Sequence, residues 1–278
     1  MENKIIVDSS IDFSDDIEFT SKEVDRVPFK ILIDSDEIAD VDLDTKELIS
    51  KMKSSKKHIK TACPSPDEYM NLFSKNGASF VVTISSALSG SYNSAVLAKN
   101  MFLEKLPNAL VHIFDTKSAA SGATLVALKV KQMIEENLNF NEIIESTNKY
   151  ISKLKTLFIL DSLDNLVKNG RISGVKARVA SLLHIVPIMG DNGNGEIELI
   201  EQVRGNKKAF SKLIDIIGGF NTDFESTILG ITHSNAEEKA NNLRKELLSR
   251  YNFKDVLIFK AGGLSTVYAD DGGIVVAF

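Results

Sequence analysis

The stretch FVVTISSALSGSYNSAVLAKN, residues 80–100, decides the fold of this chain. Its first five residues are apolar except for one threonine, which indicates a buried strand. A helical pattern follows over residues 91–104, and a loop with three serines and a glycine, residues 85–90, joins the two. A strand that leads through a short polar loop into a helix is typical of parallel α/β sheets, where ligands bind at the carboxyl ends of strands.

Similar polar clusters follow three further strand-like runs in the first 120 residues, at Asp8-Ser9-Ser10, Thr61-Ala62-Cys63-Pro64-Ser65 and Asp115-Thr116-Lys117-Ser118. Hydroxyl groups and helix N-termini that meet at one edge of a sheet form a neutral cradle for an anion such as a carboxylate. The residues that we expect to bind this ligand are Thr61, Ser89, Gly90, Ser91 and Ser118. The alternative is that one of these serines only caps a helix and that Thr61 only forms a turn.

The order of elements predicts an α/β protein with two domains. Strands and helices alternate through residues 1–153, which indicates a doubly wound, mostly parallel sheet. In residues 154–278, Asn-Gly occurs twice between two apolar runs, which is a strong hairpin signal and favours a mixed or antiparallel sheet.

Several local patterns predict individual elements. Ser65-Pro66-Asp67-Glu68 carries a capping box and predicts a helix that begins there and runs to about Lys75. We also expect one strand over residues 27–33 and a helix over residues 174–183. The glycine pairs Gly262-Gly263 and Gly272-Gly273 predict tight turns on either side of the last strand.

Composition excludes several classes of function. The net charge of −5 argues against a nucleic-acid partner, which usually requires a basic face. The single cysteine, Cys63, excludes an intramolecular disulfide and fits a reducing compartment. Since no apolar run approaches the ~20 residues that a membrane-spanning helix needs, we expect a soluble cytoplasmic protein without stable membrane insertion.

The sequence predicts binding rather than catalysis. The four histidines lack the spacing of a metal site, and His112 and His184 lie beside apolar residues, as core histidines do. Glycine-rich phosphate motifs are absent, and Cys63 is more typical of a small packed side chain than of a nucleophile. We therefore expect no catalytic residue, no metal and no cofactor.

Two arginines lie at corners where a ligand or partner can reach them. Arg171 follows Asn169-Gly170, where glycine ends a helix, and we expect it to be exposed on that turn. It either pairs with an acidic neighbour or reaches a phosphate or a partner protein. Arg204 occupies a similar strand-to-helix corner.

Five segments in order resemble the DegV family of bacterial fatty-acid-binding proteins, over essentially the whole chain. The segments are Ile6–Ser9, Thr61–Pro66, Ser85–Ala95, Asp115–Gly122 and Leu163–Ser173. The resemblance implies one bound long-chain fatty acid, such as palmitate, with its tail in a tunnel between the two domains. It places the carboxylate on the hydroxyls of Thr61 and Ser89, and implies a role in lipid transport or fatty-acid metabolism.

Members of the fatty-acid kinase system present the acid to an ATP-dependent partner kinase, and the carrier is not itself an enzyme. By this resemblance, Arg171 and Arg204 handle the phosphorylated headgroup or the kinase. The chain departs from the family pattern at Tyr268, which stands where kinase-coupled members carry a histidine. A phenol donates one hydrogen bond but carries no positive charge at neutral pH, so the kinase coupling is in question.

Two other functions compete with this interpretation. One is a small-molecule kinase-like enzyme related to the dihydroxyacetone kinases, for which Asp270-Asp271 is the nearest candidate for a metal-binding cluster. The other is a DNA-binding regulator, which the acidic charge disfavours.

Overall fold

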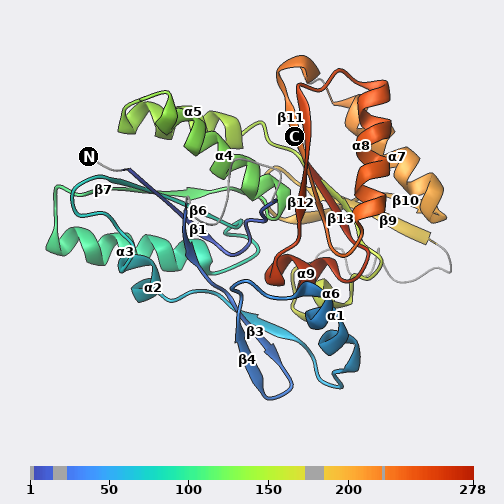
Figure 1. Ribbon diagram of the computed structural model, residues 1–278, viewed down its shortest axis with the longest axis horizontal. Coiled ribbons are helices and arrows are strands. Elements are labelled where there is room, and N and C mark those ends of the chain that lie inside the picture. Colours follow the sequence, from blue (N-terminus) through green and yellow to red (C-terminus); the bar gives the residue numbers. More distant parts are fainter. Residues whose placement is uncertain (1–2, 15–23, 173–184, 221–222) are drawn as a thin grey trace.

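The computed structural model describes residues 3–14, 24–172, 185–220 and 223–278 (Figure 1). A four-stranded parallel sheet forms the N-terminal part, in the order β2-β1-β6-β7. Its strands are β1 (Lys4–Asp8), β2 (Asp25–Val27), β6 (Ala78–Thr83) and β7 (Leu110–Asp115). The prediction of a parallel N-terminal sheet is confirmed.

A six-stranded mixed sheet forms the C-terminal part, in the order β10-β9-β8-β13-β11-β12. Its strands are β8 (Thr156–Ile159), β9 (Ile185–Asp191), β10 (Ile197–Arg204), β11 (Ile228–His233), β12 (Asp255–Lys260) and β13 (Ile274–Ala277). Only β11 and β12 pair in parallel, and β9 and β10 form the antiparallel hairpin that the Asn-Gly repeat predicts. The predicted mixed sheet is therefore confirmed.

Helices cover both sheets (Figure 1). The helices are α1 (Thr45–Ser54), α2 (Pro66–Met70), α3 (Ser91–Lys105), α4 (Ser121–Glu135), α5 (Phe140–Ile151), α6 (Asp164–Lys168), α7 (Asn206–Gly219), α8 (Glu237–Arg250), α9 (Gly263–Ala269) and the 3-10 turn η1 (Phe224–Ser226). In Figure 1, α2, α3 and α5 lie with the four-stranded sheet, and α7 and α8 lie with the six-stranded sheet. The described residues contain no helix that is long and apolar enough to span a membrane.

Helix α4 lies between the two sheets and contacts strands of both. Its first seven residues, Ser121–Ala127, are all buried, as expected for a helix that packs against protein on every side. One apolar cluster around α4 joins Phe80 of β6 to Ala277 of β13. The predicted domain boundary near residue 153 falls between α5 and β8, and it stays a prediction.

The single strand predicted over residues 27–33 is wrong. The chain forms β2, breaks at Pro28, and continues as β3 (Lys30–Ile33) in a separate antiparallel sheet with β4 (Asp36–Ala39) and β5 (Lys60–Ala62). Proline lacks the N–H that a ladder needs, so the break falls there. As a result, Thr61 lies on β5 of this separate sheet, whereas Ser89 lies in the loop that follows β6 of the four-stranded sheet.

Two further predictions differ from the structure. Gly263 begins helix α9, where we expected a tight turn, whereas Gly272 does lie in a turn with φ of +101°. Helix α2 begins with the predicted capping box but ends at Met70 rather than near Lys75. The helix predicted over residues 174–183 and His184 lie outside the described residues.

Candidate ligand-binding site

A cavity with an empty volume of about 920 Å³, its open mouth included, lies where the three sheets meet. Apolar side chains make up about half of its lining, as is usual where a small-molecule ligand binds. The apolar lining includes Phe29, Ile84, Leu88, Phe158, Leu160, Leu166, Ile197, Leu264 and Val275. The polar lining includes Thr61, Ser89, Ser118, Thr156, Arg171, Asp191, Ser265 and Tyr268.

Thr61 and Tyr268 meet at the cavity wall, where their hydroxyl oxygens lie 2.7 Å apart and share a hydrogen bond. Thr61 comes from β5 and Tyr268 from α9, which are far apart in the sequence. Both side chains are half-buried, so they are accessible from the cavity. One of the two hydroxyl protons lies in this shared bond, and the other can be donated to a carboxylate.

Ser89 lines the cavity from the loop between β6 and α3. Its Oγ accepts a hydrogen bond of 3.2 Å from the N–H of Ser91, at the start of α3. Its hydroxyl proton is not needed for that bond and can be donated to a ligand. Ser89 can thus both cap the helix and bind a ligand, because the oxygen that accepts from the N–H of Ser91 also faces the cavity.

Gly90 and Ser91 lie outside the cavity lining and hold the loop in position through contacts with Cys63, Asp8 and Tyr69. Ser91 is fully buried, and its Oγ donates to Asp8 Oδ2 at 2.7 Å and lies 2.6 Å from Tyr69 Oη. A Cβ placed on Gly90 would approach Cys63 Sγ at 3.2 Å, which is a tight contact. Of the five residues predicted for the cradle, the cavity is lined by Thr61, Ser89 and Ser118.

Asp8 is an anchor that the sequence reasoning missed. Its carboxylate accepts hydrogen bonds from the N–H of Ile84 at 3.0 Å and from Ser10 Oγ at 2.5 Å, besides the bond from Ser91. Burial raises the pKa of Asp8 above its ordinary value, and the hydrogen bonds from these serines oppose that rise. A buried aspartate at the last position of a strand, followed by two serines, is the signal that indicates such a role.

Ser118 lies at a different part of the cavity wall from Tyr268. Its Oγ is 2.7 Å from Thr156 Oγ1, the first residue of β8. The loop of Ser118 is also tied to the loop before α3, since Ser118 O accepts from the N–H of Ser85 at 2.8 Å.

Arg171 is half-buried and lines the cavity, so its predicted exposed position is wrong. Its Nε donates to Leu88 O at 2.9 Å, and one terminal nitrogen donates to Asn169 O. The turn itself forms as predicted, with Gly170 at φ of +76° in the left-handed region. Arg204 lies elsewhere, exposed at the end of β10.

Helix α9, which carries Tyr268, is held at its N-terminus by two buried carboxylates. Asp40 accepts from the N–H groups of Gly263 and Leu264 at 2.8 and 2.9 Å. Asp12 accepts from the N–H of Gly262 at 2.8 Å and from Ser265 Oγ at 3.0 Å. Burial raises the pKa of Asp12 to about 7, although its hydrogen bonds and Arg26 favour the charged form.

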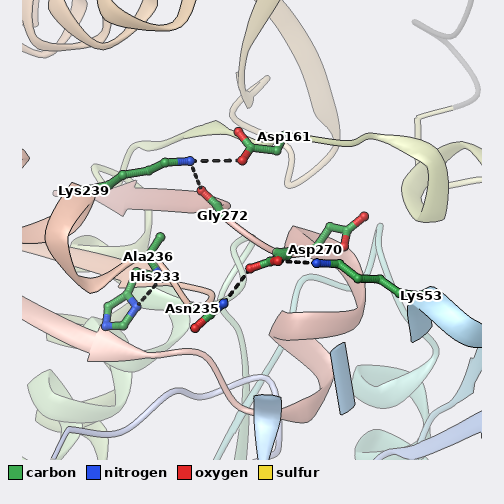
Figure 2. Close-up of polar contacts among 9 residues, drawn as sticks. Lys53, Asp161, His233, Asn235, Ala236, Lys239, Asp270 and Gly272 are labelled. Carbon is green, nitrogen blue, oxygen red and sulfur yellow. Dashed lines mark hydrogen bonds and ion pairs between the residues drawn. The ribbon is translucent and has the colours of Figure 1, made fainter. Parts of the chain in front are cut away.

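The turn after α9 is held by a surface network (Figure 2). Asp271 pairs with Lys53 of α1 at 2.5 Å and accepts from Asn235 at 2.7 Å. Lys239 of α8 donates to Gly272 O at 3.1 Å and to Asp161 at 3.0 Å. Together with the bonds to Asp12 and Asp40 at the N-terminus, these contacts fix both ends of α9. They therefore fix the position of Tyr268 in the cavity wall.

The kinase-like alternative gains little from this geometry. It needs a cluster of free carboxylates for metal ions, whereas Asp271 is already paired with Lys53 and Asn235. Within the described residues, three or more metal-ligating side chains do not come together at any point. His112 packs on Phe114, and burial, with a contribution from Lys99, lowers its pKa to about 4, as in a core histidine.

A family model described as "Uncharacterised protein, DegV family" matches residues 2–278. The chain belongs to the DegV family. It is 33% identical to a DegV domain-containing protein of Streptococcus pneumoniae, over 99% of this chain and 98% of that one. The family resemblance of the sequence motifs is thereby confirmed.

Two solved DegV structures are similar to this one over almost their whole length. A DegV protein from Ruminococcus gnavus, refined with vaccenic acid, is 40% identical with a TM-score of 0.94, covering 99% of both chains. The fatty acid kinase B3 protein of Streptococcus pneumoniae, loaded with linoleic acid, is 32% identical with a TM-score of 0.89. That match covers 100% of this chain and 99% of the other. Both neighbours share the fold described above.

Proposed function

We propose that this DegV protein binds one long-chain fatty acid in the cavity between its sheets. The observation that carries the proposal is an apolar cavity with Thr61, Tyr268, Ser89 and Arg171 in its wall. The fatty acids held by the neighbours from Ruminococcus gnavus and Streptococcus pneumoniae support it. We expect palmitate and related acids to bind, and no cofactor to be needed.

The headgroup chemistry follows from these polar side chains. Ser89 and the hydrogen-bonded pair of Thr61 and Tyr268 each donate a hydroxyl proton to the carboxylate, and hydrogen bonds to a charged acceptor are stronger than neutral ones. Arg171 supplies positive charge nearby and keeps donors to spare, because a guanidinium has five N–H groups and two are engaged. An anion bound here is therefore compensated by both donors and charge.

The tail contributes most of the affinity. Each buried CH₂ group is worth about 0.8 kcal/mol, so a long-chain acid has roughly ten kcal/mol available before the costs of ordering it. Phe158, Leu160 and Val275 provide apolar wall for such a tail. A carrier of this kind also keeps an otherwise insoluble chain in solution.

The proposed role is that of a carrier in lipid transport or fatty-acid metabolism, not of an enzyme. We include in the proposal that the carrier presents its acid to an ATP-dependent fatty-acid kinase, as the likeness to the fatty acid kinase B3 protein suggests. Arg171 and Arg204 then contact the phosphorylated headgroup or the kinase. Tyr268 is the position at which this chain differs from kinase-coupled members of the family, which carry a histidine there. A cytoplasmic location belongs to the same proposal and suits the lone Cys63, which is exposed and not packed as the sequence predicts.

Native mass spectrometry of the purified protein, with fatty-acid analysis of its solvent extract, tests the proposal. We expect one palmitic or stearic acid, or a close relative, per chain. An empty protein that also refuses added fatty acid would contradict the proposed function. Tight binding of ATP by the isolated protein would favour the kinase-like alternative instead.

A further inference from the structure

A second polar group lies in the cavity wall, apart from the pair of Thr61 and Tyr268. Ser118 Oγ and Thr156 Oγ1 lie 2.7 Å apart, and the two residues are 4% and 9% exposed. Asp191 lies beside them and accepts from the N–H of Thr156 at 2.7 Å. All three residues line the cavity.

Strand β8 places this pair at a distance from the headgroup. Thr156, Phe158 and Leu160 are alternate residues that all line the cavity, so the chain runs along it from Thr156 to Leu160. Leu160 lies close to Ala269, the residue after Tyr268, since a Cβ on Gly273 would be 2.9 Å from both side chains, and Tyr268 marks the headgroup end. Four residues of extended chain cover about 13 Å. A tail that enters at Tyr268 and follows β8 passes Ser118 and Thr156 near its middle.

The pair has hydrogen-bonding capacity left for a ligand. When Thr156 donates to Ser118, and Ser118 donates to Ala119 O at 3.3 Å, both hydroxyl protons are used and lone pairs remain on both oxygens. Asp191 accepts one backbone hydrogen bond on each oxygen, from the N–H groups of Thr156 and of Gly193 at 2.9 Å, and also keeps lone pairs. A hydrocarbon tail offers these oxygens nothing, whereas a hydroxyl on the tail can donate to them.

The position of Ser118 is preorganised. Gly122 of α4 packs directly behind it, since a Cβ there would lie only 2.0 Å from Ser118 Oγ. The loop of Ser118 is fixed again by the bond from Ser85 N–H to Ser118 O. A pair of hydroxyls held in place before the ligand arrives loses little entropy on binding.

We propose that Ser118 and Thr156 form a second polar subsite, which recognises a hydroxyl group in the middle of the acyl chain. The preferred ligands then include long-chain acids with a mid-chain hydroxyl. This inference rests on the proposed function and deepens it, because it names a chemical class of fatty acid.

The test is a titration of the intact protein with stearic acid and with a positional series of monohydroxylated stearic acids. We expect a mid-chain isomer to bind at least as tightly as stearic acid. An isomer with its hydroxyl at the far end of the chain should bind about tenfold more weakly than the mid-chain isomer, because that hydroxyl is buried away from the pair. A flat profile, or one in which every hydroxylated acid is rejected, would overturn the subsite.

Variants separate the two ends of the cavity. Thr156→Val removes the hydroxyl at constant shape and should lower the preference for the mid-chain hydroxy acid over stearic acid by about tenfold. Thr61→Val is the matched control, and it should weaken both acids equally and leave that preference unchanged. Ser118→Ala repeats the test on the other hydroxyl if Thr156→Val does not fold.

The outcomes distinguish this inference from the proposed function. If stearic acid binds and neither variant of the pair alters the preference, the subsite is wrong and the carrier function stands. If stearic acid and all of its hydroxylated isomers fail to bind, the proposed function is wrong, and the subsite is overturned with it.

Discussion

Thr61 and Tyr268 share a single hydrogen bond at the headgroup end, and Tyr268→Phe removes one of its two oxygens. We expect this variant to weaken fatty-acid binding by about 1 kcal/mol, the usual worth of one hydrogen bond. Stability should change little, since Tyr268 is half-buried and keeps its ring. Calorimetric titration with palmitic acid measures the effect. An unchanged dissociation constant would remove Tyr268 from the headgroup site.

Ser89 and Ser91 differ in role, since Ser89 is proposed to bind the fatty acid and Ser91 stabilises the folded protein. Ser89→Ala removes a donor from the cavity and should weaken fatty-acid binding by roughly 1–3 kcal/mol. Ser91→Ala is its control, because it removes one buried hydrogen bond from Asp8 and one from Tyr69 and should lower the free energy of unfolding by a similar amount. Titration and urea unfolding of both variants test the difference. The proposed cradle fails if Ser89→Ala binds palmitic acid as well as the wild type does.

Asp12 should make stability depend on pH. Its folded-state pKa is about 7, above the ordinary value of 3.8. Between these values the folded protein holds a proton that the unfolded chain has released, so its contribution to stability falls as pH rises from about 4 to about 7. Asp12→Asn cannot titrate and still accepts from the N–H of Gly262. The variant should therefore gain stability relative to the wild type as the pH increases.

Urea unfolding of both proteins at pH 5 and pH 8 measures this difference, with contributions from Asp8 and His112 common to both. Parallel pH profiles would show that Asp12 has an ordinary pKa in the folded protein.

At the scale of elements, the β9–β10 hairpin offers a matched pair of glycines. Gly193 and Gly195 have φ of +81° and +85°, where a side chain is strained. A Cβ on Gly193 meets no described atom within 4 Å, whereas one on Gly195 would lie 2.3 Å from Ser85 Oγ and 3.0 Å from Lys117 Cα. Gly193→Ala should cost about 1 kcal/mol of stability from strain alone. Gly195→Ala should cost more, and should also weaken fatty-acid binding.

Gly195→Ala should weaken fatty-acid binding because Gly195 O accepts from Ser85 Oγ at 2.8 Å. This bond joins the hairpin to the loop between β6 and α3, which carries Ser89. Thermal unfolding and titration of the two variants are compared. If both variants lose the same free energy of unfolding, the hairpin does not pack tightly against Ser85 and Lys117.

Elements with local signals were predictable, and elements with distant causes were not. The capping box at Ser65 and the Asn-Gly hairpin are contained in a few neighbouring residues, and both form as predicted. Helix α9 begins at Gly263 because Asp12 and Asp40, more than two hundred residues earlier, accept its first N–H groups. No window of sequence around Gly263 contains that information.

The residues of the candidate site also divide into those whose place follows from the local sequence and those whose place depends on distant parts of the chain. Ser89 belongs to a local strand–loop–helix motif, so its place at the cavity follows from the sequence. Thr61 also lines the cavity, but it arrives from a separate antiparallel sheet, which the residues around it did not reveal. Thr156 gave no signal, because a threonine at the start of a strand is ordinary until the fold brings Ser118 to it.

At the scale of the whole molecule, the two sheets share one apolar core around α4. That core includes Phe80 and Leu125 and reaches Ala277 of β13. Gly230 of β11 allows close packing, since a Cβ there would lie 3.1 Å from the Cβ of Ser121 on α4. If residues 1–153 and 154–278 are two domains, as the sequence predicts, they are not free to unfold separately.

We therefore predict one cooperative unfolding transition, followed by far-ultraviolet circular dichroism and by release of a fluorescent fatty acid. Because both halves line the cavity, a ligand at 100 times its dissociation constant should stabilise the whole chain by about 2.7 kcal/mol and raise a single midpoint by roughly 5 °C or more. Leu125→Ala in α4 should lower that midpoint by an amount equivalent to about 2–5 kcal/mol without splitting the transition. Two transitions, of which fatty acid shifts only one, would mean that the core around α4 does not couple the sheets.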